Sequence, residues 1–143
     1  MRPVAVALVL QTMMLVGCIS SPTSASAQTN PIIKSLTPSS GAVNAQVAIS
    51  GSGFASTGNT LTFTVISLAP GGQMPNAPSV IPNLASDGSS IVFKVLTEWR
   101  PACSYTAPGP CPIAYFPTAP GAYAVTVTNE NGTSNAMTLT VVP

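Results

Sequence analysis

Two short stretches of alternating apolar and polar residues, joined by a turn, occupy residues 31–54 of this chain. Residues 32–36 and 46–50 place apolar side chains at every second position or close to it, which is typical of half-buried β-strands. Pro-Ser-Ser-Gly at 38–41 has the composition of the turn between them. Gly51 and Gly53 give the backbone the freedom to turn again and to direct Phe54 into a core. This stretch therefore predicts a β-structure from its first residues onward.

The same alternation recurs along the rest of the chain, and no segment has helical periodicity. Further strands are expected at 61–65, at 90–96, and in a final hairpin of 122–128 with 134–142. Residues 80–84 form a short edge strand in this interpretation, because Pro82 limits pairing. Asp87-Gly88 and Asn131-Gly132 are turn sequences. The pattern predicts an all-β domain of about seven short strands, the number expected of a β-sandwich.

The segment at 31–54, together with Pro120-Gly121-Ala122-Tyr123 leading into the last hairpin, resembles the opening and closing parts of IPT/TIG domains. This resemblance implies an immunoglobulin-like β-sandwich of about seven strands over residues 31–143. Domains of that family often serve as interaction or spacer modules in surface proteins and in carbohydrate-active enzymes. It implies a fold and a general role, and it does not identify a ligand.

The N-terminal residues have the pattern of an export signal. Arg2 is followed by an apolar run at 4–16, which is shorter than the ~20 residues of a spanning helix. Leu15-Val16-Gly17-Cys18 resembles a bacterial lipobox, which predicts a signal peptide at 1–17 and lipid on Cys18. The alternative is cleavage after residue 27, at Ala25-Ser26-Ala27, to give a soluble chain. Residues 18–30 are rich in Ser, Thr and Ala, and we expect them to be a flexible tether.

Two observations favour the lipobox. The apolar run ends directly before Cys18, and Cys18 is the odd cysteine once Cys103 and Cys111 are taken as a local pair. No Asp follows Cys18, a pattern that implies outer-membrane sorting for a lipoprotein of a Gram-negative cell. We therefore expect an exported protein at the outer membrane or cell surface, with a soluble periplasmic or secreted form as the alternative.

Residues 97–120 depart from a compact IPT/TIG pattern and form a long insertion. A disulfide between Cys103 and Cys111, which export would permit, would close a ring of about nine residues within it and stabilise the fold by roughly 2.6 kcal/mol. The insertion also holds four aromatic residues as a candidate contact surface: Trp99, Tyr105, Tyr115 and Phe116. For Trp99 and Phe116 we favour the alternative that they fold back into a small core, and we assign the exposed contact role to Tyr105.

The composition argues against several classes of function. The chain has no His, the usual general base and commonest metal ligand, and its cysteines lack zinc-site spacing. Its three carboxylates, Asp87, Glu98 and Glu130, stand in predicted turns or at the start of the insertion. Only 5% of residues are charged and the net charge is +1, so no phosphate-binding surface is expected. We predict no enzyme activity, no cofactor, no metal and no nucleic-acid partner.

The sequence thus favours a non-catalytic, exported and lipid-anchored envelope module for binding or adhesion. Its partner would be a protein or a carbohydrate, and it would touch the membrane only through the lipid on Cys18. Two alternatives remain open. One is a small structural or assembly subunit of an envelope complex, which would use an exposed sheet edge, and the more remote one is a carbohydrate-binding accessory domain.

Overall fold

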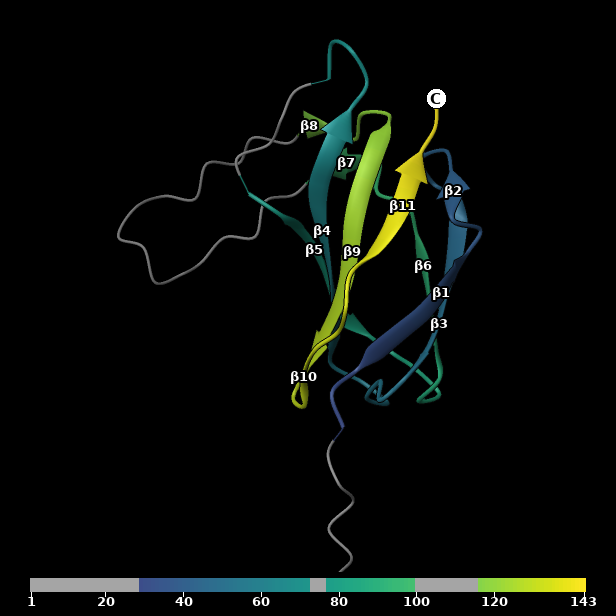
Figure 1. Ribbon diagram of the computed structural model, residues 1–143, viewed down its shortest axis with the longest axis vertical. Helices are drawn as coiled ribbons and strands as arrows, with labels where there is room; N and C mark the ends of the chain where they lie inside the picture. The colour runs from purple at the N-terminus through teal and green to yellow at the C-terminus, as the bar shows by residue number, and fades with distance from the viewer. Residues whose placement is uncertain (1–28, 73–76, 100–115) are drawn as a thin grey trace, which may run out of the picture.

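The computed structural model describes residues 29–72, 77–99 and 116–143, and every regular element within these ranges is a β-strand (Figure 1). For these residues the prediction of an all-β domain is confirmed. The strands are β1 (Ile32–Thr37), β2 (Ser40–Gly41), β3 (Gln46–Ser52), β4 (Asn59–Leu68), β5 (Ser79–Leu84), β6 (Ser90–Lys94), β7 (Glu98–Trp99), β8 (Phe116–Pro117), β9 (Gly121–Asn129), β10 (Gly132–Thr133) and β11 (Met137–Val141).

Two larger sheets form the body of the molecule. The first has the order β1-β3-β6, and all its pairs are antiparallel. The second has the order β2-β11-β9-β4-β5, with β10 paired to β9, and its single parallel pair joins β2 to β11. A separate two-stranded ladder joins β7 to β8. The first segment of the chain thus contributes β1 to one sheet and β2 to the other, so that it links the two layers at one side (Figure 1).

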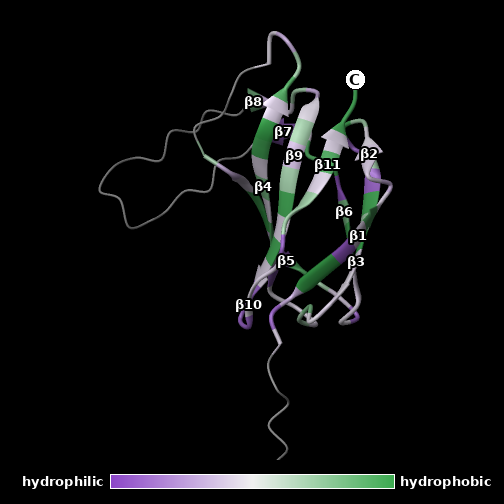
Figure 2. Ribbon diagram, viewed as in Figure 1, coloured by the Kyte–Doolittle hydropathy of each residue, from purple (hydrophilic) through white to green (hydrophobic). Residues whose placement is uncertain are grey.

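One hydrophobic core lies between the two sheets in a β-sandwich-like arrangement. In β3, β4, β6, β9 and β11 alternate residues are buried, as the alternation predicted, and Figure 2 shows apolar and polar residues alternating along the ribbons. Phe63 of β4 meets Phe93 of β6 across the core, with ring centroids 5.5 Å apart and an edge-to-face angle of 64°. The buried apolar side chains are Ile33, Leu36, Val47, Ile49, Phe54, Leu61, Phe63, Ile91, Phe93, Val95, Trp99, Tyr123, Val125, Val127, Leu139 and Val141.

The predicted strand centres are confirmed, whereas several boundaries differ. β4 continues to Leu68, beyond the predicted end at Val65, because a bulge between Val65 and Ser67 lets pairing with β9 resume. In the last hairpin the two-residue loop is Glu130-Asn131. Gly132 lies in the ladder opposite Asn129, with a φ of 129°.

Gly51 and Gly53 have different roles at the corner after β3. Gly53 has a φ of 74°, the left-handed conformation that glycine adopts without strain. Gly51 is needed for space, because a Cβ atom there would stand 2.0 Å from the Ile32 carbonyl oxygen and 2.5 Å from the Phe54 ring. The corner therefore buries Phe54, as expected, with Gly51 acting through close packing rather than through a turn.

The sandwich has two distinct ends. The described chain enters at the end that carries the β9–β10 turn, which we call the proximal end (Figure 1). The β7–β8 ladder and the C-terminus lie at the opposite, distal end (Figure 1). In the described ranges the structure contains no helix of the length and apolarity that crossing a membrane requires.

Candidate functional site

The β7–β8 ladder closes the base of the insertion at the distal end. Glu98 pairs with Pro117 and Trp99 with Phe116, and the Thr118 N–H donates to the Thr97 carbonyl oxygen over 3.0 Å. Residues 97–99 and 116–118 are thus held side by side. Cys103, Tyr105, Cys111 and Tyr115 lie outside the described residues, as does Cys18.

Trp99 fixes this ladder to the body of the sandwich. Its side chain is only 3% exposed, and its indole Nε1–H donates to the Ala77 carbonyl oxygen over 2.8 Å. Its ring lies 5.5 Å from that of Tyr123, at a tilt of 34°. The indole bond ties the end of the β4–β5 connection to the base of the insertion, so two irregular segments share one anchor.

Tyr123, near the start of β9, packs beside Trp99. Its ring is 2% exposed, and its hydroxyl donates a hydrogen bond back to the Ala119 carbonyl oxygen, four residues earlier in the chain. Burial raises the pKa of the Tyr123 hydroxyl above its ordinary value of 10.0, because desolvation disfavours the phenolate. The hydroxyl is therefore a fixed donor at neutral pH, and it holds the chain segment that leads from β8 into β9.

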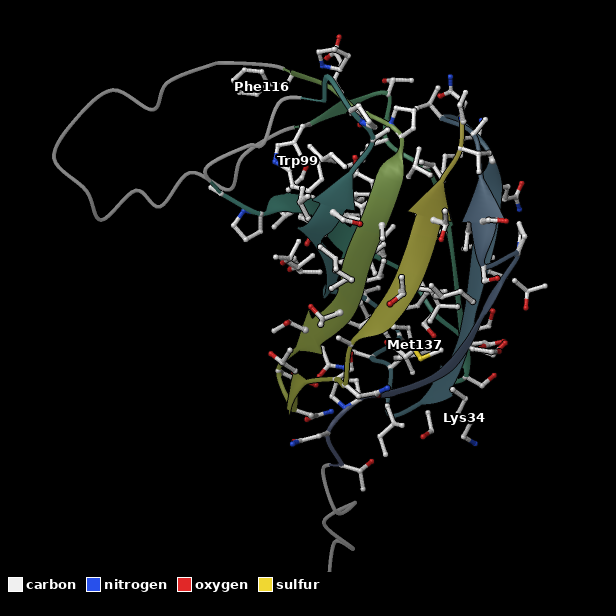
Figure 3. The ribbon with its side chains drawn as sticks, turned by 45° about the horizontal axis from the view of Figure 1, so that its top comes forward. Lys34, Trp99, Phe116 and Met137 are labelled. Atoms are coloured by element: carbon white, nitrogen blue, oxygen red, sulfur yellow. The ribbon has the colours of Figure 1, made fainter. Side chains whose placement is uncertain are left out.

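These placements settle how two of the four aromatic residues lie. Trp99 belongs to the main core, so its indole presents almost no surface to a partner. Phe116 is partly buried and packs against that core. Both residues lie at the distal end of the sandwich (Figure 3). We call Trp99, Phe116 and Tyr123 the aromatic base of the insertion.

The carboxylates Asp87 and Glu98 belong to separate parts of the chain on either side of β6. Asp87 lies in the turn before β6, and Glu98 lies in β7 after the other end of that strand. The Asp87 carboxylate accepts hydrogen bonds from the Ser89 N–H, the Ser89 hydroxyl and the Ser90 N–H at 2.7–2.9 Å. These bonds, led by the one from the Ser89 N–H, lower the pKa of Asp87 below its ordinary value of 3.8. Within the described residues no three His, Cys, Asp or Glu side chains gather as metal ligands would.

A buried amide network holds the loops of the proximal end. Asn59 is 0% exposed and is the first residue of β4. Its Oδ1 accepts from the Ala55 N–H at 2.9 Å, and its Nδ2 donates to the carbonyl oxygens of Ala55 at 2.6 Å and Leu84 at 2.9 Å. Asn129 donates to Asn59 Oδ1 at 3.3 Å and to the Gly53 carbonyl at 2.9 Å. All four hydrogen-bonding positions of the Asn59 amide are used.

A third asparagine joins the two sheets at their β1 side. Asn135, just before β11, accepts from the Ile33 N–H at 2.9 Å and donates to the Ile33 carbonyl oxygen at 3.0 Å. Its amide thus takes the place of a strand neighbour beside the β1 bulge between Ile33 and Ser35. In this region Lys34 points away from the sheets, while Met137 packs against the core (Figure 3).

Sequence reasoning missed these asparagines, because Asn is most common in turns and nothing local marks a buried one. Comparison of the chain with protein-family models and with curated proteins finds no match.

Proposed function

We propose that this protein is a non-catalytic, exported binding module of the IPT/TIG type, held at the cell envelope by lipid on Cys18. In this proposal residues 18–30 are the tether and the segment at 100–115 is the contact surface, with Tyr105 as its main aromatic residue. The partner is a protein or a carbohydrate. The observation that carries the proposal is the separation of the two ends of the sandwich.

The separation of the two ends determines which end of the domain would face a membrane. The chain enters the fold at the proximal end, and the base of the insertion lies at the distal end (Figure 1). A lipid at Cys18 would therefore keep the proximal end near the membrane and turn the insertion outward. A tether of ~12 residues has a root-mean-square span on the order of 20 Å, which leaves room for the domain above the lipid surface.

Two features support the immunoglobulin-like type. The strand orders β1-β3-β6 and β2-β11-β9-β4-β5 correspond to strands A, B and E facing A′, G, F, C and C′ of such sandwiches. Tyr123, at the start of the strand in the F position, bonds the backbone at Ala119 as the tyrosine corner of that fold does. Together with the sequence resemblance, these features favour the IPT/TIG assignment.

Mass spectrometry of the processed protein tests the anchoring. We expect an N-terminal Cys18 that carries a diacyl or triacyl mass, and partition of the protein into the detergent phase. Replacing Cys18 by Ser should abolish both. A mature chain that begins at Gln28 without lipid would refute the anchor and favour the soluble form.

Cross-linking on intact cells tests the contact surface. We expect Tyr105→Ala to weaken cross-linking to a partner, while the far-UV circular dichroism spectrum stays unchanged. Ile66→Ala is the matched control, because Ile66 is 54% exposed on β4, outside the insertion. If both variants cross-link as the native protein does, the insertion is not the contact surface.

A further inference from the structure

The three residues that precede β1 lie at the proximal end of the sandwich. Pro31 is fully buried although it stands before the first strand. Thr29 and Asn30 are exposed, so burial of their side chains does not hold them in place. In Figure 1 the described chain enters the fold at the end that carries the β9–β10 turn. The surroundings of the backbone at residues 29 and 30 therefore decide whether these residues belong to the fold.

Gly53, at the corner after β3, faces the backbone of these residues. A Cβ atom at Gly53 would stand 2.8 Å from the Asn30 carbonyl oxygen and 3.0 Å from the Thr29 carbonyl oxygen. The first of these distances is shorter than Cβ atoms show to other atoms in proteins, and a backbone carbonyl cannot swing aside as the end of a long side chain can. The space left by the missing side chain of Gly53 is thus occupied by residues 29 and 30.

Gly132 borders the same residues from the larger sheet. A Cβ atom at Gly132 would stand 2.8 Å from Oδ1 of Asn30 and 3.1 Å from its Cγ. Gly53 follows β3 of the smaller sheet, whereas Gly132 lies in β10, which pairs with β9 of the larger sheet. Asn129 of β9 joins the two sides, because its Nδ2 donates to the Gly53 carbonyl oxygen at 2.9 Å. Residues 29 and 30 therefore contact a surface that is built from both sheets.

We propose that this surface, formed by Gly53 and Gly132, is a docking surface for Thr29 and Asn30 that fixes where the N-terminal segment leaves the domain. Gly53 leaves room for the backbone of the segment, and Gly132 leaves room for the Asn30 side chain. A positive φ alone does not produce such contacts. At Gly58, where φ is 77°, an added Cβ would meet nothing within 4 Å.

The docking surface changes how a force on the N-terminal segment reaches the fold. Among the described strands β1 pairs only with β3, and a force on its first residue would act on the pairing of Ile32 with Ser52. With Thr29 and Asn30 docked, the force acts first on a surface that both sheets support. This consequence rests on the proposed function, because the lipid on Cys18 is what would exert the force. The docking itself does not depend on the lipid.

Amide ¹⁵N relaxation of the purified mature protein tests the docking. We expect order parameters of about 0.85 at Thr29 and Asn30, as in rigid backbone. Gly53→Ala should lower both below about 0.6, because its Cβ displaces the two carbonyl groups. Gly58→Ala is the matched control, since φ is 77° at Gly58 and 74° at Gly53, and the two substitutions strain the backbone alike. The control should leave the order parameters of residues 29 and 30 unchanged.

A second variant makes the test independent of whether Gly53→Ala folds. Gly132→Ala should also lower the order parameters of Thr29 and Asn30, because its Cβ meets the Asn30 side chain. In a protein that carries Asn30→Ala, which lacks the atoms that this Cβ would meet, Gly132→Ala should cause no further loss of order at Thr29.

Three results would overturn the docking. They are order parameters below about 0.6 at Thr29 and Asn30 in the native protein, Gly53→Ala and Gly132→Ala proteins in which both residues stay rigid, and a loss of order that Gly58→Ala reproduces. The anchor is judged separately. A mature chain without lipid would refute the anchor and leave these measurements unchanged, because both candidate N-termini, Cys18 and Gln28, precede Thr29.

Discussion

Replacing Asn59 by Ala should be among the most damaging polar substitutions in this protein. The side chain is 0% exposed and satisfies three backbone groups: the Ala55 N–H and the carbonyl oxygens of Ala55 and Leu84. The substitution leaves these groups in the interior without their partner. Water cannot replace the amide without opening the corner between β3 and β4.

The expected cost follows from the number of bonds. Each lost hydrogen bond contributes about 1 kcal/mol, and a buried group left unpaired costs about 1–3 kcal/mol. Three such groups give an expected loss of about 3–5 kcal/mol in the free energy of unfolding, with little added by the 3.3 Å contact from Asn129. Against a total of about 5–15 kcal/mol for a typical domain, this is a large fraction.

Urea unfolding followed by Trp99 fluorescence measures the loss, because Trp99 is the single tryptophan and is buried. The slope of the free energy against urea should stay unchanged, so the midpoint carries the effect. Thr64→Val is the matched control on the same strand, since Thr64 is exposed and Val keeps its branched shape. We expect that control to lie within about 0.5 kcal/mol of the native protein.

Asn59→Asp separates hydrogen bonding from shape. It replaces the Nδ2 donor by an oxygen that faces the carbonyls of Ala55 and Leu84, so the charged form is repelled and its folded pKa is raised. A raised pKa means that the variant is most stable below the unfolded value of about 3.9, and loses stability as pH rises through the folded value. A loss below about 1 kcal/mol for Asn59→Ala, or an Asp variant without this pH dependence, would refute the role of the network.

Three further predictions concern the other hydrogen-bonding side chains. Tyr123→Phe removes the bond to Ala119 and should lower the free energy of unfolding by about 1 kcal/mol at pH 7. Because the folded pKa of Tyr123 is raised, the native protein should also lose stability as pH rises from about 10. In urea titrations at about pH 8–11 this loss should be larger for the native protein than for the Phe variant. The pKa of Asp87 is lowered, so its stabilising effect should be present above pH 3.8 and lost as pH falls through the folded value, and thermal unfolding of Asp87→Asn should lack this acid-dependent step. Asn135→Ala should cost about 1–2 kcal/mol and speed amide exchange at Ile33, while exchange at the centre of β9 keeps its relative rate.

The long strands could be predicted from the sequence because their alternation is itself the cause of their burial. In β6, Ile91 and Phe93 face the core while Val92 and Lys94 face outward, as expected from a period of two. The pattern fails where pairing depends on distant residues. β2 consists of Ser40-Gly41, which looks like part of a turn, and it is a strand only because β11 lies beside it.

The candidate site shows the same limit. The sequence predicted an insertion at residues 97–120 and favoured burial of Trp99 and Phe116 in a small core of their own. Nothing in it indicated that Trp99 would join the main core through Ala77, because that contact depends on the end of the β4–β5 connection. The two halves of the β7–β8 ladder are 16 residues apart along the chain, so no local pattern marks their pairing.

Both ends of the sandwich are held by the same physical means. Asn59 and Asn129 bind loop carbonyls at the proximal end, and Trp99 and Tyr123 do so at the distal end. All four are neutral at pH 7, in a chain with only 5% charged residues. Because buried neutral donors form bonds that salt screens little, the loops at each end are positioned by groups of the core itself.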